Sequence, residues 1–307
     1  MAIMPWGTLG LATVIGAALA GLDPMALGCA SCAVSTPVFL ALGAMALWVA
    51  GERRPGAFGA LIAAWFAFIA TLALVNGVIG PEIAGVGAGG LVLGIGLALT
   101  RLKSPLQSWP RNAWPYMALL FSVVMIKTAL MVTSDASFVV KGASVSWKPL
   151  ESPGIPLGFI FVLILLVERH AELSARLGRA WAGRSWKPLA TIFFFLLMSQ
   201  GLLKGSFLTG SQAALSGYLT GSNVGGNAIF MPGIARLHPD RALWFSAIQN
   251  SGAGHGALGS LSIIALVSGS AKTSAAEEQA LIRFAFAVVC LNTVLVGLTG
   301  SVIIALS

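Results

Sequence analysis

The polar residues that could do chemistry in this sequence lie inside apolar runs, in two glycine-rich clusters. The first reads Gly-Ser-Asn-Val-Gly-Gly-Asn over 221–227, and the second begins Gln-Asn-Ser-Gly and extends over 249–260. Amide and hydroxyl side chains, and the N–H groups at a helix start, are donors that a carboxylate can accept. We therefore expect a small organic anion to bind here, with Asn223, Asn227 and Asn250 as its main contacts. The full set of expected substrate-binding residues is Ser222, Asn223, Gly225, Gly226, Asn227, Gln249, Asn250 and Ser251.

Two ionisable residues are candidates for proton coupling. His255 is the only histidine inside an apolar run, and histidine changes its charge near neutral pH. The alternative for His255 is a neutral side chain that is hydrogen-bonded to a neighbouring helix. Glu82 follows Pro81 at the start of an apolar run, where it could instead cap a helix. Lys127 is expected to extend to the membrane interface.

Other classes of function find no support in the residue pattern. The sequence has no metal-ligand spacing, no phosphate-binding loop and no GxSxG motif, so we expect neither an enzyme nor a bound cofactor. Cys29 and Cys32 form a single CxxC without a second pair, which favours membrane-buried thiols over a metal or redox site. The net charge of +8 is spread between the apolar runs, which argues against nucleic-acid binding.

The elements that must position these residues are membrane helices. Hydrophobic residues make up 57% of the chain and charged residues only 9%. A bilayer span needs about 20 mostly apolar residues, so the 307 residues allow about ten spans. We expect one all-α, polytopic transmembrane domain over 1–307, without a cleavable signal peptide.

Basic loops give the expected orientation in the membrane. Cytoplasmic loops collect Lys and Arg. If every apolar run crosses once, all four basic loops and both termini face the cytoplasm, in keeping with a bacterial inner membrane. These loops contain Arg53–Arg54, Arg101–Arg111, 168–187 and Arg236–Arg241.

Some of the apolar runs are poor ordinary helices. Each glycine in a helix interior costs about 1 kcal/mol relative to alanine. The clusters at 220–227 and 249–260 are therefore predicted to be broken helices or hairpin tips, and Ser35-Thr36-Pro37 is a third candidate. Such breaks at membrane depth are typical of transporter binding sites. The alternative is close helix packing through small residues.

Several of these motifs resemble those of the L-lactate permease family. The segment Leu219–Phe230 is similar to the family's Gly-Ser-Asp hairpin motif, and Asn250-Ser251-Gly252 to the motif that follows it. Further similarities come in the expected order from about residue 10 to the end of the chain. They are Ser35-Thr36-Pro37 with Leu42-Gly43-Ala44-Met45, Gly80-Pro81-Glu82, Trp114-Pro115-Tyr116, Ser152-Pro153-Gly154 and Glu278-Gln279-Ala280-Leu281-Ile282-Arg283-Phe284.

The resemblance implies an inverted-repeat transporter fold, in which each repeat has a re-entrant hairpin and a broken helix. It divides the chain into an incomplete first repeat (1–100), connecting helices (101–186) and a second repeat (187–307). The resemblance implies a first repeat with little or no hairpin, because Met1 falls near the point where that hairpin ends in the family. Asn223 replaces the family's aspartate, Gly225 and Gly226 replace its Ser/Thr positions, and Gly259-Ser260-Leu261-Ser262 replaces its Ser-Pro-Gln.

The expected function is secondary transport of a 2-hydroxymonocarboxylate such as L-lactate or glycolate, coupled to a proton or to sodium. One alternative is a non-transporting remnant or subunit of a larger membrane assembly. Another is an organic-anion transporter with altered substrate or ion coupling. Self-association into a homo-oligomer is also an open expectation.

Overall fold

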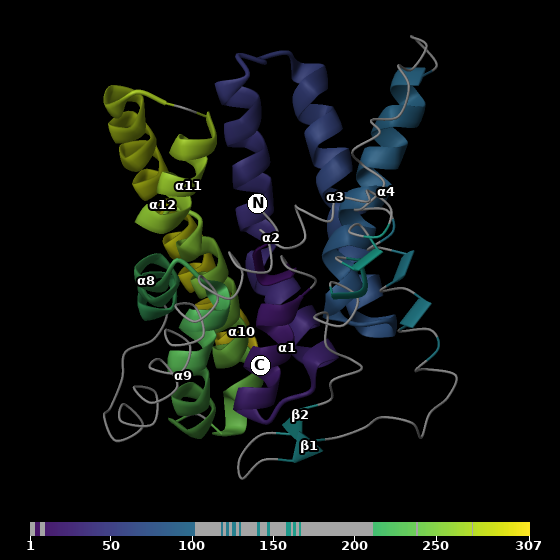
Figure 1. Cartoon of the computed structure of the whole chain (residues 1–307), viewed down its shortest axis with the longest axis vertical. Helices are drawn as coiled ribbons and strands as arrows, with labels where there is room; N and C mark the ends of the chain where they lie inside the picture. Colours follow the sequence, from purple (N-terminus) through teal and green to yellow (C-terminus); the bar gives the residue numbers. More distant parts are fainter. Residues whose placement is uncertain are drawn as a thin grey trace. The chain divides into compact units, whose positions relative to one another are not determined.

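The computed structural model describes residues 4–6, 10–101, 211–237, 239–271 and 273–307, together with scattered residues between 118 and 166. The chain forms two compact units, one of Met1–Leu93 with Leu196–Ser307 and the other of Gly94–Phe195. Described elements of the first unit are helical (Figure 1). In the second unit, two-residue strands β1 (Val140–Lys141) and β2 (Ser146–Trp147) pair antiparallel, with Val140 opposite Trp147. The prediction of an all-α membrane protein is therefore confirmed in its class, apart from this short ladder.

Three helices are long and apolar enough to cross a membrane among the described residues. They are α2 (Pro24–Val49), α3 (Pro55–Val78) and α12 (Ala275–Leu306). Helix α2 begins where the Asp23 carboxylate accepts the N–H of Ala26 at 2.8 Å. Helix α12 begins with a capping box between Ser274 and Glu277. Apolar side chains on α3 stay exposed, as the lipid-facing side of a span requires: Phe66 is 63% exposed and Leu74 66%. The chain is thus an integral membrane protein.

The remaining helices of the first unit are mostly short. They are η1 (Met4–Trp6), α1 (Leu11–Ala20), α4 (Pro81–Arg101), α8 (Ser211–Thr220), α9 (Asn223–Leu237), η4 (Pro239–Arg241), α10 (Ala242–Ala257) and α11 (Leu261–Ala271). With 10 residues, α1 is about 15 Å long, half of the hydrocarbon core. Helix α1 is therefore too short to cross the bilayer by itself.

The predicted break at 220–227 is confirmed. Helix α8 ends at Thr220 and α9 begins at Asn223. Gly221 between them has φ +64°, a left-handed conformation that glycine adopts without steric cost. The two short helices pack against each other, so the run at 211–232 is a helix pair rather than a single span.

The predicted break in the 249–260 cluster is confirmed at 258–260, between α10 and α11, whereas the predicted break at Ser35–Pro37 is wrong. Helix α10 is continuous to Ala257, and α2 is continuous through Pro37. The glycines of α10 serve close packing instead: a methyl group at Gly256 would collide with the backbone of Ala214 on α8. Glycine lets the two backbones approach, and the resulting van der Waals attraction between the helices offsets its low helix propensity.

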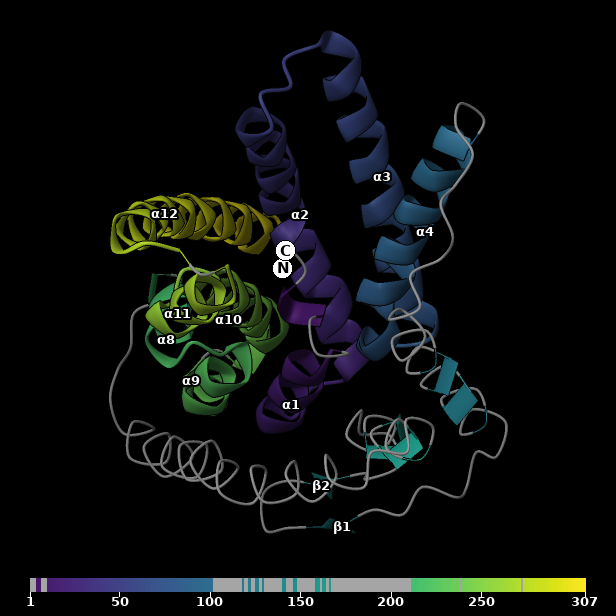
Figure 2. The same ribbon diagram turned by 45° about the horizontal axis from the view of Figure 1, so that its top comes forward.

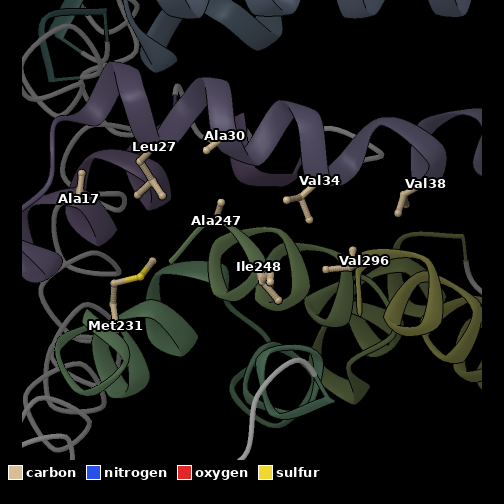
Figure 3. Close-up of a cluster of buried hydrophobic side chains, with 9 residues drawn as sticks. All are labelled: Ala17, Leu27, Ala30, Val34, Val38, Met231, Ala247, Ile248 and Val296. Carbon is tan, nitrogen blue, oxygen red and sulfur yellow. The ribbon is translucent and has the colours of Figure 1, made fainter. Parts of the chain in front are cut away.

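An apolar core joins α2 to α10 and α12. Val34 and Val38 on α2 lie in one buried cluster with Ile248 on α10 and Val296 on α12 (Figure 3). Helices α8, α9, α10 and α11 gather beside α12 (Figure 2). This packing holds the polar face of α10 against α1, α2 and α9.

Candidate functional site

Five neutral polar side chains from four helices meet in the interior of the first unit. We call them the amide cluster: Thr13 on α1, Ser31 on α2, Asn223 and Asn227 on α9, and Asn250 on α10. All are buried, and Asn223, with 5% of its surface exposed, is the most accessible. Buried polar groups are costly without hydrogen bonds, so their partners determine what the cluster can bind.

Asn250 is the centre of the amide cluster. Its Nδ2 donates to Thr13 Oγ1 and to Ser31 Oγ, both at 2.9 Å. Its Oδ1 accepts from Asn227 Nδ2 at 2.8 Å and from Asn223 Nδ2 at 3.3 Å. These four bonds use the full capacity of the amide. Asn250 thus holds the cluster together rather than offering free groups to a ligand.

Two backbone carbonyls set the direction of these hydrogen bonds. The Thr13 hydroxyl donates to the C=O of Pro5 at 2.7 Å, and a carbonyl can only accept. Thr13 Oγ1 must therefore accept from Asn250, which fixes the orientation of the Asn250 amide. Asn227 Nδ2 also donates to the C=O of Ala12 at 3.0 Å, which fixes Asn227 independently. The hydrogen-bond network, rather than a choice of amide rotamer, thus sets which atoms remain free.

The amide atoms of the cluster that remain free are acceptors. Asn223 Oδ1 and Asn227 Oδ1 are buried and have no hydrogen-bond partner among the described residues. Asn223 and Asn227 are four residues apart on α9, so their side chains lie on one face, with Cβ atoms about 5–6 Å apart. The cluster therefore presents two neighbouring carbonyl oxygens that lack donors.

The start of α9 adjoins the cluster, because Asn223 is its first residue. Ser222 Oγ accepts the N–H of Gly225 at 3.2 Å, and the C=O of Ser222 accepts the N–H of Gly226 at 3.0 Å. The N–H groups of Asn223 and Val224 have no acceptor within the helix. They lie at the positive end of the helix dipole, which favours an acceptor with negative charge.

Four of the predicted substrate contacts serve packing or capping in this structure. Ser222 caps α9, and Gly225 packs against Thr220. A methyl group at Gly226 would lie 2.7 Å from Ser216 Oγ on α8. Gln249 faces the same helix, since its Nε2 donates to Ser216 Oγ at 3.1 Å.

The remaining predicted contacts lie in or next to the amide cluster. Asn223, Asn227 and Asn250 belong to it, and Ser251 Oγ donates to the C=O of Ser31 at 3.2 Å. The structure therefore brings together the three residues that the sequence ranks first. It also adds Thr13 and Ser31, which sequence reasoning missed. The signal for Thr13 was available, because it is a hydroxyl in the middle of an otherwise apolar short run.

His255 occupies a separate, largely aromatic environment on α10. Its Nε2 lies 3.2 Å from Ser35 Oγ on α2. Its ring packs edge-on against Phe39, with 5.9 Å between the ring centroids. Phe39 in turn packs against Trp6, also with 5.9 Å between the ring centroids. His255 Nδ1 is buried and has no hydrogen-bond partner among the described residues. The alternative expectation of a histidine bonded to a neighbouring helix matches the contact with Ser35.

Glu82, the other coupling candidate, lies in the first turn of α4 and is 4% exposed. Gly10 packs tightly against this turn: its φ is +65°, and a methyl group there would collide with the C=O of Pro81. Glu82 is thus buried at a helix start, the position that capping predicts.

Contacts between α2 and α10 give their relative direction. Ser251 contacts Ser31, and His255 contacts Ser35. An advance of four residues along α10 therefore corresponds to an advance of four residues along α2. The two helices therefore run in the same direction.

Comparison of the chain with family models, curated proteins and solved structures gives no match. Within the described part of the chain, no group of three or more His, Cys, Asp or Glu side chains could hold a metal ion. Lys127, His170 and His238 lie outside the described residues, and so do Trp114–Tyr116 and Ser152–Gly154. The amide cluster is therefore the candidate site on its geometry alone.

Proposed function

We propose that the chain is a secondary transporter of a small 2-hydroxymonocarboxylate such as L-lactate or glycolate. The observation that carries the proposal is the amide cluster with its two partnerless oxygens, deep in a membrane protein. Polar groups within a membrane are expensive and commonly line a substrate or ion path.

The groups at the cluster complement this class of substrate. The N–H groups at the start of α9 can donate to a carboxyl oxygen. The amide oxygens of Asn223 and Asn227 can accept the proton of the 2-hydroxyl group. The resemblance of the 219–230 and 250–252 segments to the L-lactate permease family supports the same class of substrate.

Coupling to a cation belongs to the proposal, because the described cluster contains no positive side chain to balance a carboxylate. A proton is the leading choice, with His255 and Glu82 as the protein groups that could carry it, and sodium is the alternative. We also propose an inverted-repeat architecture on the basis of the resemblance, a bacterial inner-membrane location with cytoplasmic termini on the basis of the basic loops, and self-association of the chain.

Uptake of labelled L-lactate or glycolate into proteoliposomes with an imposed proton gradient tests the function. Asn223→Ala is the informative variant, because Asn223 makes a single long hydrogen bond and its removal should leave the fold intact. We expect this variant to lose most of the uptake. Asn292→Ala is the matched control: Asn292 is a buried amide on α12 without hydrogen-bond partners in the described part of the chain.

Two results would contradict the proposal. One is an absence of uptake above that of empty vesicles for any small organic acid. The other is an equal loss of uptake in the Asn223 and Asn292 variants when both fold normally. The first result would favour a non-transporting subunit.

A further inference from the structure

The two partnerless oxygens of the amide cluster restrict the chemical form of the ligand. Asn223 Oδ1 and Asn227 Oδ1 can only accept hydrogen bonds, and Pro5 and Ala12 fix the network so that these amides cannot simply turn around. An ionised carboxylate is also an acceptor only. A carboxylate oxygen next to these two atoms would therefore be repelled and left unpaired, which is costly in a buried site.

We propose that the amide cluster binds its substrate as the neutral acid, so that the coupled proton travels on the substrate's own carboxyl group. This inference rests on the proposed function and specifies its substrate form. A 2-hydroxy acid with a protonated carboxyl group has two O–H donors, one on the carboxyl and one on the hydroxyl. They match the two acceptors, Asn223 Oδ1 and Asn227 Oδ1, in number. The carboxyl C=O is left for the N–H groups at the start of α9.

Charge in the surroundings of the cluster supports this form. The ionisable residues described on the elements that pack around the cluster or against its helices are Asp23, Cys29, Cys32, Glu82, Tyr218, Arg236, Asp240, Arg241, His255, Glu277, Glu278, Arg283 and Cys290. None of them is a hydrogen-bond partner of an amide-cluster residue in the described part of the chain. A carboxylate bound there would have no close compensating charge, and burial of such a charge is strongly unfavourable. Protonation removes the charge before the substrate enters.

A sodium ion suits the two unpartnered oxygens less well than the O–H donors of the neutral acid do. Hard cations need a shell of several oxygens, and the described cluster leaves only two oxygens unpartnered. The other cluster oxygens already take part in hydrogen bonds: Asn250 Oδ1 accepts two, and Thr13 Oγ1 and Ser31 Oγ each accept one from Asn250.

The proton balance of the transport step is simple. The carboxylate takes one proton from water on the side where the substrate concentration or acidity is higher. The neutral acid binds, crosses and dissociates, and the proton returns to water on the other side. One proton therefore moves with each substrate, and no protein side chain has to change its charge.

Ligand-dependent thermal stabilisation of the purified full-length protein tests the inference. The probes are L-lactate, L-lactamide and methyl L-lactate, each titrated at pH 5, 6, 7 and 8. Lactamide keeps N–H donors in place of the acid O–H and carries no charge at any of these pH values. The methyl ester keeps the hydroxyl but lacks the second donor.

The expected results differ among the three probes. The apparent Kd of lactate should rise about tenfold per pH unit, because only the neutral acid binds and its fraction falls by that factor. The Kd of lactamide should be the same at all four pH values. The methyl ester should bind at least about tenfold more weakly than lactamide, because one acceptor stays unpaired.

Variants separate this model from protonation of the protein. In His255→Gln, the tenfold rise in the Kd of lactate per pH unit should persist. This pH dependence would vanish if His255 carried the proton. Asn223→Ala should weaken lactamide binding about tenfold, and the control Asn292→Ala should not change it. The inference would be overturned if the Kd of lactate did not change with pH, if the Kd of lactamide changed with pH as that of lactate does, or if binding required sodium. Each of these results would leave the transport proposal in place. An absence of binding by all three probes and of uptake would overturn both proposals.

Discussion

Replacement of Asn250 by leucine tests whether the amide cluster holds the helices together. The side chain makes four hydrogen bonds, to Thr13, Ser31, Asn223 and Asn227, with lengths from 2.8 to 3.3 Å. Side-chain hydrogen bonds contribute about 0.6 kcal/mol on average within membranes and about 1 kcal/mol in soluble proteins. Four such bonds add up to about 2–4 kcal/mol. We expect Asn250→Leu to lower the free energy of unfolding by that amount.

The same replacement at Asn292 is the control, with an expected effect of opposite sign. Asn292 is 1% exposed, and neither of its amide atoms has a hydrogen-bond partner among the described residues. Leucine there removes an unsatisfied buried amide and adds apolar contact. Removal of such an amide should therefore raise stability by about 1 kcal/mol.

The measurement is the free energy of unfolding in mixed micelles titrated with a denaturing detergent, followed by far-UV circular dichroism. Both variants receive the same side chain on a membrane helix, so the difference between them reports the hydrogen bonds. An Asn250→Leu variant within about 0.5 kcal/mol of the wild type would refute the view that this network is a main stabilising contact. A destabilised Asn292→Leu variant would show that the Asn292 amide has partners after all.

Two further predictions concern packing and a surface loop. Gly256→Ala should destabilise the protein in the same unfolding assay, because the added methyl group collides with the backbone of Ala214. In Gly89→Ala on α4, the added methyl group meets nothing within 4 Å, so this variant should stabilise its helix by about 1 kcal/mol. In the loop between α2 and α3, the paired Arg54 guanidinium lowers the pKa of the Glu52 carboxyl from 4.5 to about 2. The stabilisation that this pair gives the folded state is present above the ordinary pKa of glutamate and is lost as the pH falls toward about 2. Carboxyl NMR titration should place the Glu52 midpoint near 2, and Arg54→Gln should return it toward 4.5.

Local features explain why parts of the fold could be predicted from the sequence. The spans α2, α3 and α12 follow from length and apolar composition, which the bilayer thickness demands of any crossing helix. The break at Gly221 follows from a short polar, glycine-rich stretch whose central residue adopts φ +64°. Both features depend only on neighbours along the chain.

Glycine composition alone predicted a break in the 249–260 cluster but not that α10 stays helical to Ala257. Glycine lowers helix propensity wherever it occurs, but Gly252 and Gly256 of α10 each face the backbone or Cβ of α8. Close contact with a second helix keeps α10 continuous. The partner helix α8 decides this case, and the sequence of α10 by itself does not contain it.

The candidate site shows the same division. Residue type by itself determined that Asn223, Asn227 and Asn250 are neutral donors and acceptors suited to the interior of a membrane. Only the tertiary structure decided that Asn250 uses all four of its hydrogen bonds within the protein, on residues as distant in sequence as Thr13. It also decided that the Pro5 and Ala12 carbonyls leave Asn223 and Asn227 with free acceptors. An amide can face either way until fixed neighbours choose its orientation, and these neighbours come from the other end of the chain.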